Sequence, residues 1–201
     1  MLHLDPRFSP AVTESVGAIE RRSDAEIVVV VVGRSGSYRD LAWAAALGCS
    51  LVALGLLAWA PWEFAGVLFP VYAAIAAAIA GFTVARSAPL TRLLAGKRRM
   101  QAQVREAAEA VFVQETVHGT RRRTGVLVFV SSLEARVEVL PDQGILGRVP
   151  GAALADLDLR AGSLDELVGG LRRLGDLLAT HVPPVEGDNP NEVDDAPRVR
   201  A

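Results

Sequence analysis

The residue in this sequence best placed to do chemistry is Asp142, in the polar corner Pro-Asp-Gln-Gly at positions 141–144. The corner follows a segment of alternating apolar and charged residues, which predicts a strand. A carboxylate just beyond a strand end lies where open α/β sheets tend to bind ligands. We therefore hypothesise a divalent-metal or phosphate site at Asp142, with Glu134 and Asp24 as further carboxylates and Ca²⁺ or Mg²⁺ as the ion.

The same four residues are also typical of a β-turn. Proline presets one backbone dihedral, aspartate can accept hydrogen bonds from the backbone that follows it, and glycine tolerates a positive φ. A single carboxylate is a poor cage for calcium, which takes about six to eight oxygen ligands. The pattern favours the turn over the site, and both interpretations remain open at this stage.

Three consecutive arginines, Arg121, Arg122 and Arg123, precede a second apolar segment and could clamp a phosphate. A run of like charge in a loop is more often solvated. Close to a membrane it can equally contact anionic lipid headgroups. We therefore keep phosphate or headgroup contact as the candidate role of these arginines.

Composition excludes several classes of protein. The chain has 201 residues with 21 Lys and Arg against 23 Asp and Glu, and the two signs are mixed along it. This charge pattern argues against a basic surface that binds the nucleic-acid backbone. Cys49 is the single cysteine, which excludes a disulfide framework and a thiolate metal site. No Gly-rich phosphate loop, G-x-S-x-G or HExxH motif occurs, and we assign no catalytic residue.

Residues 41–85 form a nearly charge-free middle segment. Two apolar runs, 41–62 and 64–85, are separated only by Glu63. A helix needs about 20 apolar residues to cross the hydrocarbon layer, so each run is long enough and the pair predicts a transmembrane hairpin. The alternative is two alanine-rich helices buried in a soluble protein, but a chain of this length has too little protein to enclose both.

Basic residues flank the hairpin on both sides and are absent from the turn, so we expect both termini and the soluble domain to be cytoplasmic. The flanking residues are Arg21, Arg22, Arg34 and Arg39 before the first run, and Arg86, Arg92, Lys97, Arg98 and Arg99 after the second. Trp59 and Trp62 suit the outer interface, and the basic cluster after Ala85 would lie against anionic headgroups or act as a topology signal. The predicted location is the bacterial inner membrane.

The soluble domain is predicted to be discontinuous, with residues 10–40 and 96–183 on either side of the hairpin. One helix and the β-branched strand EIVVVVV precede the hairpin, and neither can form a core alone. Their partners follow it: a helix at 100–117, strands at 126–130 and 135–139 joined by a turn at 131–134, a weaker helix at 152–159, and a leucine-striped helix beginning at the capping box Ser163 and Glu166. Alternation of helices and strands predicts an α/β fold with a mostly parallel, mixed sheet. Residues 185–201 are predicted to be an acidic, disordered tail.

Several segments resemble the TPM domain, and specifically its bacterial integral membrane subgroup, in which two spans interrupt the domain. The segments are Ala25-Glu26-Ile27, Thr124-Gly125-Val126-Leu127, and Glu134 to Val139 leading to Asp142-Gln143-Gly144-Ile145. The resemblance covers about residues 10–40 and 100–183 and implies a three-layer α/β/α fold with a mixed central sheet. Some members of that family are described as acid phosphatases, and some bind divalent metal through acidic loop residues.

Two functional hypotheses follow. The first is an inner-membrane protein whose TPM-like domain is an interaction or assembly module for another membrane protein. The alternative is a metal-assisted acid phosphatase, a phosphomonoesterase, using the Asp142 loop. A transporter is disfavoured because neither span has an ionisable group at membrane depth. The predicted partners are the lipid bilayer and a membrane protein, with no nucleic acid; Gly48, Gly55 and Gly66 could allow close helix contact, either between copies of the chain or between the two spans.

Overall fold

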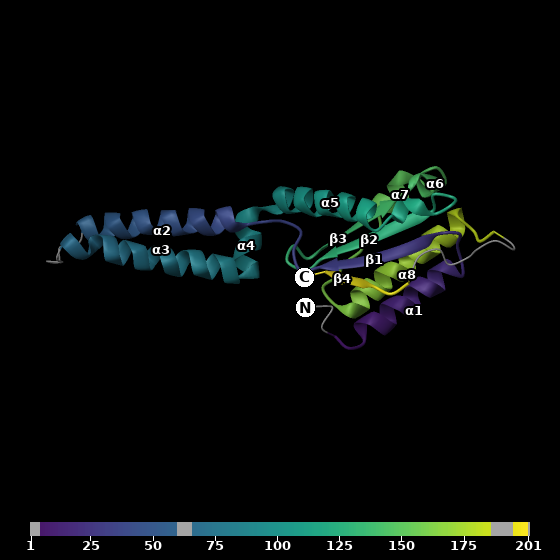
Figure 1. Cartoon of the computed structure of the whole chain (residues 1–201), viewed down its shortest axis with the longest axis horizontal. Helices are drawn as coiled ribbons and strands as arrows, with labels where there is room; N and C mark the ends of the chain where they lie inside the picture. Colours follow the sequence, from purple (N-terminus) through teal and green to yellow (C-terminus); the bar gives the residue numbers. More distant parts are fainter. Residues whose placement is uncertain (1–4, 60–65, 186–194, 201) are drawn as a thin grey trace. The chain divides into compact units, whose positions relative to one another are not determined.

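The computed structural model describes residues 5–59, 66–185 and 195–200 of the chain. The chain divides into two compact units, shown in Figure 1. The α/β unit comprises Met1–Ser35 and Gln101–Ala201, and the helical unit comprises Gly36–Met100. The α/β unit is therefore discontinuous in sequence, with the helical unit inserted between its first and second strands.

The α/β unit contains a mixed four-stranded sheet, which confirms the expected α/β class and the mixed sheet. Its strands are β1 (Glu26–Val32), β2 (Gly125–Ser131), β3 (Arg136–Pro141) and β4 (Arg198–Arg200), in the order β3-β2-β1-β4. Both β2 and β4 run parallel to β1, whereas β3 is antiparallel to β2. Nearly every residue of β1 and β2 is buried, because the sheet has helices on both faces, and this explains the unbroken valine runs in the sequence.

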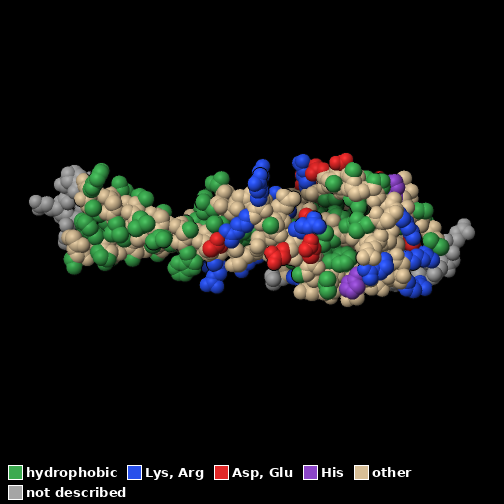
Figure 2. All heavy atoms as spheres, turned by 90° about the horizontal axis from the view of Figure 1, so that it is seen from above, with side chains coloured by type: hydrophobic (Ala, Val, Ile, Leu, Met, Phe, Trp, Pro, Cys, Tyr) green, Lys and Arg blue, Asp and Glu red, His purple; other side chains and the backbone are tan. Residues whose placement is uncertain are grey.

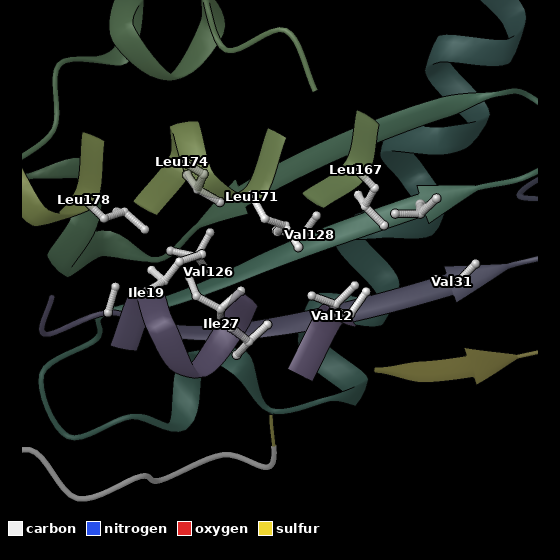
Figure 3. Close-up of a cluster of buried hydrophobic side chains, with 14 of the residues drawn as sticks. Val12, Ile19, Ile27, Val31, Val126, Val128, Leu167, Leu171, Leu174 and Leu178 are labelled. Atoms are coloured by element: carbon white, nitrogen blue, oxygen red, sulfur yellow. The ribbon is translucent and has the colours of Figure 1, made fainter. Parts of the chain in front are cut away.

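Helices α1 (Phe8–Glu20) and α8 (Leu164–His181) pack on one face of the sheet. Figure 3 shows this core: Val12 and Ile19 of α1, Ile27 and Val31 of β1, Val126 and Val128 of β2, and Leu167, Leu171, Leu174 and Leu178 of α8. Each such leucine stabilises the fold by about 1.5–3 kcal/mol relative to exposure to water. The predicted cap is present at the start of α8, where Ser163 Oγ accepts a hydrogen bond from the Glu166 N–H at 3.2 Å. The Glu166 carboxylate accepts from the Gly162 N–H rather than from that of Ser163.

Helix α5 (Lys97–Gln114) covers the opposite face. Its residues Val104, Ala108 and Val111 pack against Val28, Val30, Leu127 and Phe129 of the two central strands. The helix ends three residues earlier than predicted, because Thr116 has a left-handed backbone with φ 55° and a short 3₁₀ turn, η3 (Val117–Gly119), follows. The α5 face and the α1/α8 face thus use alternate residues of each strand.

Strand β3 is an edge strand, and its register determines which of its backbone groups face outward. The Asp142 N–H donates to the Gly125 carbonyl at 2.8 Å, in register with the pairing of Pro141 with Val126. Hydrogen-bonded and non-hydrogen-bonded pairs alternate along an antiparallel ladder, so Val137, Val139 and Pro141 direct their backbone groups away from β2. Proline is tolerated at position 141 for this reason, since no N–H is needed there. Short helices α6 (Gln143–Leu146) and α7 (Gly151–Ala155) follow β3.

The prediction of a disordered tail over 185–201 is wrong at its end, because Arg198–Arg200 forms strand β4. This strand pairs with Val30–Val32 of β1, and both arginines form ion pairs with Glu115, next to the end of α5. These ion pairs and the backbone hydrogen bonds to β1 stabilise a segment whose composition alone predicts disorder. Residues 186–194 lie outside the described residues.

The helical unit is a hairpin of α2 (Arg39–Trp59) and α3 (Phe69–Arg86), with a 3₁₀ turn, η2 (Gly66–Leu68), before α3 and helix α4 (Ala88–Ala95) after it. Both long helices are sufficiently long and apolar to cross a membrane. They approach closely where Gly81 faces Ala42 and Ala46, whereas a side-chain carbon at Gly48, Gly55 or Gly66 would meet no atom within 4 Å. The three predicted glycines therefore do not pack the spans together. The predicted turn with Trp62 and Glu63 lies outside the described residues.

The apolar side chains of this hairpin are exposed rather than buried. None of the residues in α2 is buried, and only Ala73 and Val84 are buried in α3. Trp43 is 72% exposed and Trp59 is 93% exposed. Figure 2 shows hydrophobic side chains over the surface of the hairpin.

Candidate functional site

The buried carboxylates predicted as ligands lie at two different edges of the sheet. Strands β1 and β2 are parallel and in register, so they share an amino edge near Glu26 and Gly125 and a carboxyl edge near Val32 and Ser131. Asp24 precedes β1 and Asp142 hydrogen-bonds Gly125, which places both at the amino edge. Glu134 contacts Ser131 at the carboxyl edge. Six residues of strand separate the two edges, roughly 20 Å.

Asp142 is not at the edge where parallel sheets usually bind ligands. The rule refers to the carboxyl ends of parallel strands, whereas β3 runs antiparallel to β2 and ends at the amino edge. The predicted four-residue turn at 131–134 already implies that β3 runs back along β2, and the observed antiparallel pairing confirms it. The position of Asp142 relative to the strand ends therefore does not support a ligand site at this corner.

The Asp142 carboxylate has two internal roles. It is the N-cap of α6, accepting a hydrogen bond from the Gln143 N–H at 2.8 Å. It also pairs with Arg123, with Nε–Oδ2 and NH2–Oδ1 distances of 2.7 and 3.1 Å, and only 3% of Asp142 is exposed. These contacts fix the corner by a helix cap and an ion pair, which gives it a structural role, although Gln143 and Gly144 begin helix α6 instead of forming the expected β-turn.

Position 144 requires glycine because backbone atoms of another loop lie too close for a side chain, and not because of its backbone angles. Its N–H donates to the Arg123 carbonyl at 2.8 Å. A side-chain carbon at this position would lie 2.4 Å from the Arg122 carbonyl oxygen and 2.6 Å from that of Arg123. Among the described glycines only Gly96 has a positive φ, so Gly144 does not use the positive φ that glycine tolerates. The left-handed residue at this corner is Arg123, with φ 58°.

Asp24 lies beside two further arginines at the same edge. Its Oδ1 lies 2.8 Å from Arg122 NH1, and its Oδ2 lies 3.8 Å from Arg148 NH1. The backbone N–H of Asp24 donates to the Val182 carbonyl at 3.0 Å, which joins the start of β1 to the end of α8. Asp24 is 5% exposed, so its charge is compensated by the two guanidinium groups rather than by water.

The arginine run is divided between these two aspartates. Arg122 pairs with Asp24 and Arg123 with Asp142, while Arg121 is exposed. The structure therefore does not bring Arg121, Arg122 and Arg123 together on one common anion. Their arrangement neutralises two buried carboxylates at the amino edge.

Glu134 joins two loops at the carboxyl edge. Its carboxylate accepts hydrogen bonds from the Ser35 N–H, at 3.1 and 3.2 Å to the two oxygens, and from the Ser131 hydroxyl. Backbone bonds from Ser132 to Val32 and from Leu133 to Gly33 run beside it. Glu134 therefore holds the turn after β2 against the loop after β1.

The three predicted ligands do not fit a common Ca²⁺ or Mg²⁺. Asp24 and Asp142 are each paired with arginine, and Glu134 lies at the opposite edge. Among the described residues no group of three His, Cys, Asp or Glu side chains is placed to hold a metal ion. A hard cation needs several converging oxygens, and a neighbouring guanidinium opposes its binding.

A cluster of three other carboxylates at the amino edge is not apparent from the sequence. Glu20, at the end of α1, accepts a hydrogen bond from the Ile27 N–H at 2.9 Å. Burial raises the pKa of Glu20 from 4.5 to about 8, and the charges of Glu26 and Asp195 add to the effect. A hydrogen bond between the side chains of Glu20 and Asp195 also connects α1 to the segment before β4. No local signal links Asp195 to a glutamate 175 positions earlier.

Comparison with known proteins supports the fold alone. No protein-family model matches the chain, and no curated protein matches it. The NMR structure of the BA42 protein from the psychrophilic bacterium Bizionia argentinensis is similar to this chain, with a TM-score of 0.58 and 15% identity. The match covers 98% of this chain and 95% of that chain.

Replacing Gly144 by alanine is expected to destabilise the α/β unit by about 1–3 kcal/mol, because the new methyl group collides with two backbone carbonyls. Gly147→Ala is the matched control, since its side-chain carbon would meet only the Gln143 carbonyl oxygen, at 3.5 Å. The measurement is the thermal unfolding midpoint of each full-length variant in mild detergent. An equal midpoint for the two variants would contradict the assigned role of Gly144.

The stability of the chain is expected to fall as pH rises from about 5 to 9, because Glu20 is protonated in the folded state up to about pH 8 and ionises near 4.5 when unfolded. Between about pH 4.5 and pH 8 the folded state holds a proton on Glu20 that the unfolded state has lost. The stabilisation from this proton declines as the pH rises through this range and is lost above about 8. Glu20→Gln keeps an acceptor for the Ile27 N–H but cannot titrate. Unfolding midpoints measured across this range should decline less in Glu20→Gln than in the wild type, and parallel declines would refute the assignment.

Proposed function

We propose that this chain is a bacterial inner-membrane protein that holds a TPM-like domain at the cytoplasmic face, as an interaction or assembly module for another membrane protein. The observation that carries the proposal is the hairpin of two long apolar helices whose side chains are exposed. A core helix of a soluble protein has its apolar face covered by protein. Lipid is the medium that would cover the apolar surface of α2 and α3.

The aromatic residues of α2 support this assignment. Trp43 and Trp59 are exposed near the two ends of the helix and lie sixteen residues apart, roughly 24 Å along its axis. Tryptophan favours the two interfaces of a bilayer whose hydrocarbon core is about 30 Å thick. The absence of Lys and Arg from residues 41–85, together with the basic flanks, favours cytoplasmic ends.

The arrangement of the α/β unit is consistent with the TPM-like fold that we propose. Helices α1 and α8 on one face and α5 on the other give three layers around a mixed sheet. The BA42 likeness supports this arrangement at the level of the fold. The TPM assignment itself rests on the segments around Glu26, Gly125 and Asp142.

The outer edge of β3 is the surface that we assign to the partner. The backbone groups of Val137 and Val139 point away from β2 and make no hydrogen bond within the described part of the chain. An unpaired strand edge is a template for an added strand, and main-chain hydrogen bonds then provide the affinity. The proposed partner therefore contributes an extended segment that continues the sheet beyond β3.

The phosphatase alternative has weaker support from the same geometry. It requires Asp142 to bind a metal or to act on a phosphate, yet that carboxylate is buried, caps α6 and pairs with Arg123. Using it would break both contacts. The two hypotheses can be separated because they depend on different residues.

The experiment compares Val139→Pro with Val139→Ala in full-length protein purified from bacterial membranes in mild detergent. Proline removes the outward N–H without breaking the β2–β3 ladder, whereas alanine shortens the side chain and keeps the N–H. We expect a partner that co-purifies with the wild type and with Val139→Ala to be lost from Val139→Pro. Equal recovery with both variants would contradict the edge assignment. Hydrolysis of an aryl phosphate that Asp142→Asn abolishes would instead support the phosphatase.

A further inference from the structure

Helix α4 is an element that the sequence pattern did not predict. It begins immediately after α3, with Ser87 in an extended conformation as its N-cap and Pro89 in its first turn, and it ends at Gly96, where φ is 73°. Figure 1 shows α4 running across the end of the hairpin at which α2 begins and α3 ends. The chain thus leaves α3 and turns at once.

The small side chains of α4 face the hairpin. Thr91 and Ala95 are buried, and Thr91 Oγ1 donates a hydrogen bond to the Val84 carbonyl of α3 at 2.9 Å. Contacts with both α2 and α3 hold the helix in place within the helical unit. This face of α4 is therefore fixed by protein.

The large apolar side chains of α4 face outward. Leu93 is 77% exposed and Leu94 is 49% exposed. A surface helix in water normally has the opposite arrangement, with leucines covered by protein and small or polar residues outside. Two adjacent exposed leucines on a helix that begins directly after an apolar span extend the exposed apolar surface of the hairpin, and such continuous apolar surfaces mark protein or membrane contacts.

The charged residues of α4 and of the segments directly before and after it are all basic. Residues 86–100 contain the basic side chains Arg86, Arg92, Lys97, Arg98 and Arg99, and no Asp or Glu. Arg99 pairs with Asp40 at 2.7 Å and lies over the Tyr38 ring, which fixes the start of α2 to the start of α5. Lys97 and Arg98 are exposed. A cationic surface beside exposed leucines matches the boundary between anionic headgroups and acyl chains.

We propose that α4 is an interfacial membrane helix: Leu93 and Leu94 insert into the acyl boundary of the cytoplasmic leaflet, and Lys97 and Arg98 bind its anionic headgroups. This inference rests on the proposed membrane anchoring of the hairpin. It assigns the leucine surface to lipid rather than to a second copy of the chain, because the same surface is both cationic and directly continuous with the second span. The helix then fixes the depth at which the hairpin sits.

The test places an environment-sensitive fluorophore at single cysteines in a Cys49→Ser background and reconstitutes each full-length protein in vesicles. The labelled positions are Leu93 on α4, Leu47 within α2, and Val113 on α5, an apolar side chain of similar exposure in the α/β unit. Quenching by brominated lipid reports acyl contact, and quenching by iodide reports water contact. We expect lipid quenching at 47 and 93 and iodide quenching at 113.

The three positions separate failure of this inference from failure of the membrane proposal. Lipid quenching at 47 with iodide quenching at 93 would overturn the interfacial helix and leave the membrane anchor intact. Iodide quenching at both positions would overturn both. Protection from both quenchers at 93 would show that protein covers the leucines, which also overturns the inference.

The proposed contact of Lys97 and Arg98 with anionic headgroups is tested separately. Lipid quenching at 93 should be stronger in vesicles that contain phosphatidylglycerol than in phosphatidylcholine alone, and Lys97→Gln with Arg98→Gln should remove that difference. Arg105→Gln is the matched control, because Arg105 pairs with Glu109 on α5. A difference that survives the Lys97 and Arg98 substitutions, or that is absent in the wild type, would overturn the headgroup assignment.

Discussion

The constraint on which the rest of this structure depends is the solvation of the helical unit. Helices α2 and α3 are long and apolar, yet no residue of α2 and only Ala73 and Val84 of α3 are buried. Each Å² of apolar surface removed from water stabilises a state by about 25 cal/mol, so surface of this extent must be covered. If lipid covers it, the antiparallel hairpin returns the chain to the side from which it left, and α4 meets the bilayer at that same side.

Inside the α/β unit a different constraint operates, namely that each buried carboxylate must be neutralised or hydrogen-bonded. The chain does this in three ways: Asp142 and Asp24 pair with arginines, Glu134 accepts backbone and hydroxyl hydrogen bonds, and Glu20 retains its proton. An isolated buried charge would be strongly destabilising. These carboxylates therefore position loops and strand ends, and this structural role accounts for acidic residues that would otherwise suggest a metal site.

The elements that could be predicted from sequence are those with a dense local signal. The valine runs of β1 and β2 lie within one residue of their predicted bounds, and the leucine-striped helix α8 begins at its predicted cap. Strand β4 could not be predicted, because its order depends on Glu115 and on β1, which are remote in sequence. Helix α4 was not predicted, because eight residues directly after a long apolar run give little periodic signal of their own.

The candidate site was less predictable, because it depends on relations between strands. The sequence correctly predicts the hairpin turn at 131–134 and a corner after β3, but the place of this corner beside Asp24 also depends on the parallel register of β2 with β1. Gly144 is conspicuous in the sequence, yet its neighbours are the carbonyls of Arg122 and Arg123 from another loop. The separation of Glu134 from Asp142 likewise follows from the register of the sheet.

The most direct test of the central claim is fractionation of a bacterial lysate that contains the full-length chain. With no detergent present, high-speed sedimentation followed by an alkaline carbonate wash should leave the protein in the membrane pellet, and mild detergent should then release it. Recovery of folded protein in the detergent-free supernatant would contradict the account, because some cover other than lipid would then shield the apolar faces of α2 and α3.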